Sequence, residues 1–329
     1  MVNAGVALPG VPAEPQGLNK KQTWMERLRK GDEVVHLITM AGAWSIIVIT
    51  LLLVQHLWVY SRIARHTFGW HFLLTSTWDP VSGQFGAWPF VYGTVVTSLL
   101  ALCIAIPVGL GTAIFLAEMA PRSISNPLTF MVELLAAVPS VIYGLVGIFL
   151  MIPALSAVMP YFQKVFGWLP IFSGTFYGVS YFTAAVVLAV MVIPFIVSIS
   201  REVLLAVPMS QREAMMALGA TKWDVTWRAV VPYARQGIMG SIFLALARAL
   251  GETMAVTMVI GNVAQVSTSL MAPGYTIAAV IANEFTEATG DLYLHALIEL
   301  GLVLFAVTMI INALARLLML TMKPHEVTA

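Results

Sequence analysis

Two charged residues inside an apolar stretch are the strongest candidates for chemistry in this sequence. Arg248 and Glu252 stand four residues apart in ARALGETMAV, so a continuous helix would place both on one face. Counted from Arg235, Arg248 lies about thirteen residues into the apolar segment, or ~20 Å at helical rise, near the middle of a bilayer. A charge at that depth is costly, and such residues mark substrate routes by default.

Two interpretations of this pair are open. In one, Arg248 and Glu252 form an ion pair that joins helices inside a bundle. In the other, they lie on an anion pathway or gate, where a guanidinium offers paired donors to a tetrahedral oxyanion. The carboxylate would accept a hydrogen bond from phosphate, which keeps a proton near neutral pH, but not from sulfate. Glu299, in the last apolar segment, is a further candidate.

A polar segment between two apolar blocks, residues 201–235, is the second candidate. It holds five Lys and Arg residues, although only 10% of the whole chain is charged. Ser210 and Glu213 have the spacing of a capping box, and Gly219 predicts a left-handed helix end. Three apolar residues at helical spacing form a stripe that is free to bury against a partner: Ala214, Ala217 and Leu218.

A second short helix is predicted directly after Gly219. Thr221 and Asp224 have capping spacing at its start, and Pro232 is expected to close it. Two compact helices at a membrane surface suit the docking of another protein better than a passive linker.

Composition indicates what kind of structural elements position these residues. Hydrophobic residues make up 59% of 329 residues and the net charge is +1, which excludes an ordinary soluble domain and a basic surface for nucleic acid. The chain is expected to be an all-α membrane protein. Six apolar segments approach the ~20 residues that a bilayer requires: 37–60, 89–117, 130–155, 178–200, 235–260 and 293–320.

Lys and Arg are distributed unevenly between the connecting segments. Three lie on one side of the predicted spans, and 13 lie on the other, which is therefore expected to be cytoplasmic, with both termini. The segments assigned to the cytoplasm are 1–36, 118–129, 201–235 and 316–329.

Prolines occur inside the predicted spans, where each removes a backbone hydrogen bond. They are consistent with simple kinks that improve packing, and equally with helices bent around a translocation path. The four positions are Pro107, Pro139, Pro153 and Pro194.

No nucleotide or metal motif is present in the sequence. The phosphate-binding loop pattern is missing, and no Lys directly follows a Gly. The six histidines lack metal-ligand spacing, although His66 and His71 are close. We therefore expect no catalytic residue, metal or cofactor on this chain. Uphill transport would need energy from another chain or from an ion gradient.

Part of the polar segment resembles a known motif. Glu213-Ala214, Gly219 six residues after Glu213, and Pro232 thirteen residues after Gly219 are similar to the EAA loop of ABC importer permeases. The resemblance implies that this loop couples the spans to a cytoplasmic ATPase. The sequence departs from the motif at two positions: Met215, where the family has Ala, and Ala229, where it has Ile.

Three longer segments resemble the PstC type of phosphate permease within that family, and the resemblance runs through nearly all of residues 37–322. It implies a six-helix type I permease domain over 37–322, with cytoplasmic tails at 1–36 and 323–329. The segments that carry the resemblance are 92–118, 135–147 and 247–262.

The resemblance also implies the partners and the location. These are a homologous permease of the PstA type, a PstB-type ATPase dimer that carries ATP and Mg, and an extracytoplasmic PstS-type phosphate-binding protein, in the bacterial cytoplasmic (inner) membrane. The chain itself would be non-catalytic and would form half of the translocation pathway. A permease for another oxyanion, such as molybdate or sulfate, and a secondary transporter or membrane scaffold are the alternatives.

Overall fold

In the computed structural model, residues 32–321 are described, and this part of the chain is helical without an extended strand. Two compact units are distinguished, Met1–His56 and Leu57–Ala329, and α2 supplies the described residues of the first. The predicted tail 323–329 and most of the tail 1–36 lie outside the described residues. The elements are α2 (Asp32–Tyr60), α3 (Arg62–Phe68), α4 (His71–Leu74), α5 (Trp88–Ile114), η1 (Phe115–Met119), α6 (Arg122–Ala136), α7 (Ser140–Val146), η2 (Gly147–Met151), α8 (Ile152–Phe166), η3 (Pro170–Phe172), α9 (Tyr181–Leu205), α10 (Met209–Ala217), α11 (Lys222–Val225), η4 (Thr226–Val230), α12 (Val231–Leu250), α13 (Met254–Val259), α14 (Ile277–Glu284) and α15 (Asp291–Thr321).

Among the described residues, six helical segments are long and apolar enough to cross a membrane, which confirms the predicted number. Four of them also agree closely with the predicted boundaries, whereas the third and fifth differ. The six segments are Val35–Tyr60, Trp88–Met119, Ser140–Phe166, Tyr181–Leu205, Lys222–Leu250 and Asp291–Leu317.

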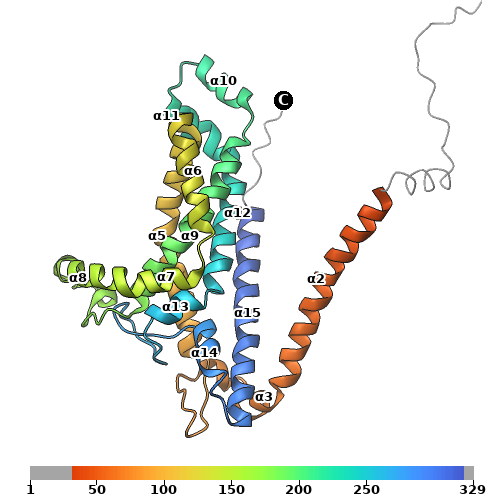
Figure 1. Cartoon of the computed structure of the whole chain (residues 1–329), viewed down its shortest axis with the longest axis vertical. Helices are drawn as coiled ribbons and strands as arrows, with labels where there is room; N and C mark the ends of the chain where they lie inside the picture. Colours follow the sequence, from red (N-terminus) through yellow and green to blue (C-terminus); the bar gives the residue numbers. More distant parts are fainter. Residues whose placement is uncertain (1–31, 322–329) are drawn as a thin grey trace, which may run out of the picture. The chain divides into compact units, whose positions relative to one another are not determined.

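The third predicted span, residues 130–155, is interrupted. α6 ends at Ala136 and α7 begins at Ser140, with Pro139 as its N-cap. Proline lacks an N–H and disfavours helical geometry in the residue before it, so the break falls inside the predicted segment. The apolar helix therefore starts later than predicted. Its last part, α8, runs across the direction of α5 and α9 (Figure 1).

The fifth span is displaced in the opposite direction. The chain is helical from Lys222 through α11, η4 and α12 to Leu250, and Gly251 ends the helix. The prediction that Pro232 closes a helix is therefore wrong, since Pro232 lies near the start of α12 inside a continuous helical segment.

π-helical turns explain how these helices continue past proline. η4 ends two residues before Pro232, and η2 ends two residues before Pro153. A π turn shifts the backbone hydrogen-bond register by one residue. The helix can therefore continue past a proline even though proline has no backbone N–H to donate.

α9 is the central helix of the second unit and packs against α5, α6 and α12 (Figure 1). Ser180 caps its start, since the Ser180 hydroxyl accepts a hydrogen bond from the Thr183 N–H at 3.1 Å. Near its other end, the buried hydroxyls of Ser200 and Ser241 lie 2.7 Å apart and join α9 to α12. The buried hydroxyls of Ser200 and Ser241 are thus paired with each other inside the apolar bundle.

Aromatic side chains cluster around α3 and α14, and Figure 1 shows these helices at the end of the unit away from α10. The Trp78 ring packs edge-on against Phe90 at a centroid distance of 4.9 Å, and its Nε1 donates to Glu284 at 2.8 Å. Burial raises the pKa of Tyr275 to about 12, so this phenol stays neutral. These contacts hold the short helix α14 against the core.

The close approach of α5 to the segment before α14 gives a stability prediction. A Cβ added at Gly93 would lie 2.1 Å from the Tyr275 carbonyl oxygen, whereas one added at Gly111 on the same helix would meet no atom within 4 Å. Gly93→Ala should destabilise the fold by about 1–3 kcal/mol through overpacking. Gly111→Ala should leave it unchanged or slightly more stable. Thermal unfolding of both variants in detergent checks this, and equal midpoints would contradict it.

Candidate functional site

The polar segment contains one short helix, α10, as predicted, whereas the second predicted short helix is the start of the long helical segment Lys222–Leu250, and the cap of α10 also differs from the prediction. α10 begins at Met209, with Pro208 as its N-cap and no side-chain cap. The capping box predicted for Ser210 and Glu213 is therefore wrong. Ser210 already lies in the first helical turn, so its hydroxyl does not occupy the position from which a cap accepts the free N–H groups.

The turn between the two helices agrees with the prediction. Gly219 has φ +81°, the left-handed region in which a side chain would be strained. The Thr221 hydroxyl accepts from the Asp224 N–H at 3.2 Å and donates to the Asp224 carboxylate at 2.6 Å. Gly219 and Thr221 together fix the direction in which the chain leaves α10.

The predicted docking stripe is open on the surface of the described chain. No residue of α10 is buried, and Glu213, Ala214 and Ala217 are all exposed. Leu218, which ends the helix, is 84% exposed. Pro232, the last residue of the motif, lies away from this stripe on α12. An exposed apolar side chain of this kind is available to a partner.

An ion pair that the sequence did not predict attaches α10 to the spans. The Arg212 guanidinium donates to both Glu118 carboxylate oxygens, at 2.8 and 3.4 Å, and also to the backbone oxygens of Leu204 and Val207. Both charged side chains are largely buried, with 12% and 11% exposed. Bidentate geometry makes this a strong, directional contact. The sequence contains one indication that Glu118 has a special role: it is the first charged residue after Asp79.

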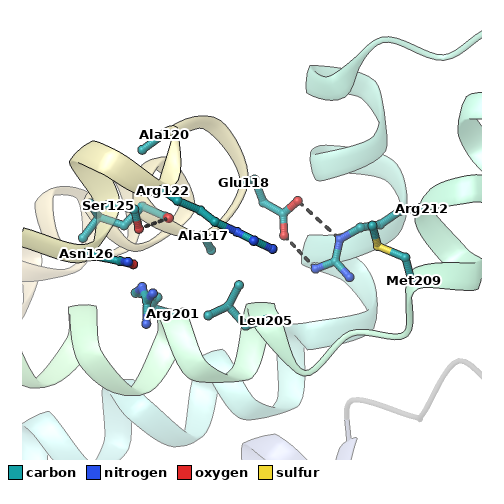
Figure 2. A pocket seen from close by; sticks show the side chains of 11 residues that line it. Ala117, Glu118, Ala120, Arg122, Ser125, Asn126, Arg201, Leu205, Met209 and Arg212 are labelled. Carbon is teal, nitrogen blue, oxygen red and sulfur yellow. Dashed lines mark hydrogen bonds and ion pairs between the residues drawn. The ribbon is translucent and has the colours of Figure 1, made fainter.

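The ion pair forms one wall of a pocket of about 570 Å³ (Figure 2). Arg122 and Asn126 enter from α6, Arg201 and Leu205 from α9, and Met209 and Arg212 from α10. The Arg122 side chain extends across the pocket towards Glu118 (Figure 2). Three guanidinium groups and one carboxylate therefore line this pocket.

Arg248 occupies the last turn of α12 and is half-buried. Its guanidinium carbon lies 4.3 Å from the centre of the Phe195 ring on α9, a cation–π contact. Its Nε atom is buried without a hydrogen-bond partner, and within residues 32–321 no carboxylate pairs with it. The positive charge is thus stacked on an aromatic ring but not neutralised.

The expected pairing of Arg248 with Glu252 is wrong. α12 ends at Leu250, so Glu252 follows the break and does not share a helix face with Arg248. The Glu252 carboxylate instead accepts a long hydrogen bond, 3.4 Å, from the Ala255 N–H in the next helix. The turn at Gly251 separates two residues that a continuous helix would have brought together. Glu299 is buried in α15, and its Oε2 has no hydrogen-bond partner in the described part of the chain.

Most of this chain matches a known protein family. Residues 105–324 match the model of the binding-protein-dependent transport system inner membrane component. The chain belongs to this family. The matched range contains α10, the turn at Gly219 and the helix break after Arg248.

Individual relatives of this permease are similar along almost their whole length. It is 45% identical over 313 residues to the phosphate transport system permease protein PstC of Mesorhizobium japonicum, covering 94% of this chain and 96% of that protein. It is 46% identical to PstC of Xylella fastidiosa over 295 residues, covering 88% and 90%. A chain of the MetNI methionine ABC transporter has 16% identity and a TM-score of 0.47, covering 73% of this chain and 98% of that one.

Family membership gives the coarse setting of the permease. Together with six helices that can cross a membrane, it makes the chain a multi-pass protein of the bacterial inner membrane. It is one component of an ABC importer that contains other subunits, and permeases of this class are generally non-catalytic.

The Glu118–Arg212 contact predicts a local weakness of the permease at α10. Arg212→Gln would leave the buried Glu118 carboxylate without its charged partner, at a cost of about 3–5 kcal/mol. Hydrogen exchange over residues 209–217 should become markedly faster. Arg228→Gln is the matched control because Arg228 pairs with Asp224 on the surface, with 75% of its side chain exposed. Equal exchange in the two variants would contradict the assigned role of the pair.

Proposed function

We propose that this chain is the permease subunit of an ATP-driven importer of inorganic phosphate and forms half of its translocation pathway. The proposal is supported by the similarity to PstC proteins over nearly the whole chain. The positive-inside distribution of Lys and Arg supports a cytoplasmic position for both termini and for α10.

The observation that carries the proposal is the environment of Arg248. A half-buried guanidinium that stacks on Phe195 and has no carboxylate partner within residues 32–321 offers an attractive position to an anion that passes between the helices. The break after Leu250 adds backbone carbonyls and N–H groups that a continuous helix would have consumed.

Selectivity is assigned to Glu252 as part of the same proposal. Because Glu252 is not tied to Arg248, its carboxylate is available to accept a hydrogen bond from an anion that carries a proton. Phosphate near neutral pH has such a proton, and sulfate does not. A permease for another oxyanion would share Arg248, so competing anions distinguish the two functions.

Coupling is assigned to the exposed stripe of α10. Ala214, Ala217 and Leu218 would enter a groove on a cytoplasmic ATPase, with Glu213 beside them on α10 and Gly219 directly after the docking helix. The ATPase would be a PstB-like dimer carrying ATP and Mg. One chain offers one docking helix to a dimer with two grooves, so a PstA-like second permease would complete the core. A PstS-like protein would deliver phosphate from outside.

The pathway role of Arg248 predicts the outcome of uptake measurements. Arg248→Gln should nearly abolish phosphate uptake without loss of the assembled complex, because it removes the charge but keeps a polar side chain. Arg248→Lys should retain partial uptake, since it keeps the charge and loses the fork. Glu252→Gln should admit more sulfate relative to phosphate. Near wild-type uptake by assembled Arg248→Gln transporter would refute the pathway role.

The coupling role of α10 predicts a separable defect. Gly219→Val should strain the left-handed turn and reduce uptake far more than it reduces ATPase association or ATP hydrolysis. Gly240→Val is the control, because Gly240 lies within α12 and an added Cβ there meets no atom within 4 Å. Transport and hydrolysis measured in the same vesicles check this, and normal uptake in Gly219→Val would exclude the role.

A further inference from the structure

The pocket between α6, α9 and α10 carries an excess of positive charge that the fold does not use. Arg212 is committed to Glu118 and to backbone oxygens, so it is satisfied. Arg122 makes no hydrogen bond or ion pair with the described residues around it. Among the described residues, Glu118 is the only carboxylate that lines the pocket, which leaves Arg122 and Arg201 without a partner inside it.

Of these two arginines, Arg201 gives the stronger evidence for a bound anion. Only 15% of its side chain is exposed, and its one ion pair, at 2.9 Å, is with Glu202, whose side chain is 72% exposed. Its Nε is buried and has no acceptor in the described chain. A buried donor without an acceptor is unfavourable, and an anion in the pocket would remove that cost.

The remaining lining specifies the kind of anion. Asn126 adds an amide beside Arg201, and the Ser125 hydroxyl is already donated to the Leu116 oxygen at 2.8 Å. Two guanidinium forks and an amide suit a tetrahedral oxyanion with several acceptor oxygens, and a volume of about 570 Å³ holds such a group with water. Leu205 and Met209 give the same pocket an apolar side.

We infer that this pocket binds one phosphate group between Arg122 and Arg201, at the end of the bundle from which α10 projects. The group is supplied either by inorganic phosphate or by the headgroup of an anionic phospholipid, which share this chemistry. The bound group joins α6 to α9 next to the Glu118–Arg212 contact. The site lies on different helices from Arg248 and is a second anion site. Only the choice of inorganic phosphate as one source rests on the proposed function.

Binding to the intact transporter in nanodiscs tests the inference. In phosphatidylcholine nanodiscs, radiolabelled inorganic phosphate is titrated in an Arg248→Gln background, which removes the pathway site. In nanodiscs that contain phosphatidylglycerol, native mass spectrometry counts the retained anionic lipid. Arg122→Gln and Arg201→Gln are each compared with Arg228→Gln, which removes one exposed charge from the same end of the unit outside the pocket.

Binding of either inorganic phosphate or anionic lipid supports the inference if substitution of Arg122 and of Arg201 weakens that binding. We expect at least about tenfold weaker phosphate binding, or loss of the retained lipid, in both pocket variants and no change in Arg228→Gln. Arg122 is exposed, so its replacement does not endanger folding. Phosphate binding and lipid retention that are both insensitive to Arg122 and Arg201 overturn the inference. Phosphate uptake by the wild type is measured separately, so that a failed transport function with an intact pocket, or the reverse, is recognised.

Discussion

The hydrogen bonds of the backbone are the constraint on which this structure depends. Hydrocarbon supplies no donors or acceptors, so each spanning segment must satisfy its own backbone groups. The fold meets this demand with long helices. The π turns before Pro153 and Pro232, and the break after Leu250, are local solutions of the same problem.

The break after Leu250 links that constraint to function. Had the helix continued, Arg248 and Glu252 would have neutralised each other on one face. Because Gly251 ends the helix, Glu252 turns to the N–H of Ala255, and Arg248 keeps an uncompensated charge against Phe195. A small change of backbone direction thus converts a structural ion pair into two separate polar groups along the proposed pathway.

The buried contact between Glu118 and Arg212 connects this interior to the surface helix. Its two largely buried side chains resist separation far more than a surface pair would. The contact therefore ties α10 directly to the end of the second span. The same contact borders the pocket that holds Arg122 and Arg201, so occupancy of that pocket and the position of α10 are physically adjacent.

Sequence alone determined the properties that depend on local chemistry. Apolar length predicted six spans, glycine predicted the left-handed turn at Gly219, and side-chain spacing predicted the Thr221 cap. Tertiary structure decided the rest. The pairing of Glu118 with Arg212, residues 94 positions apart, depends on how α5 and α9 pack. The separation of Arg248 from Glu252 likewise depends on the direction of the chain after Gly251, which helical spacing cannot foresee. Side-chain periodicity reports which face of an element is apolar, but only packing determines which distant charges meet.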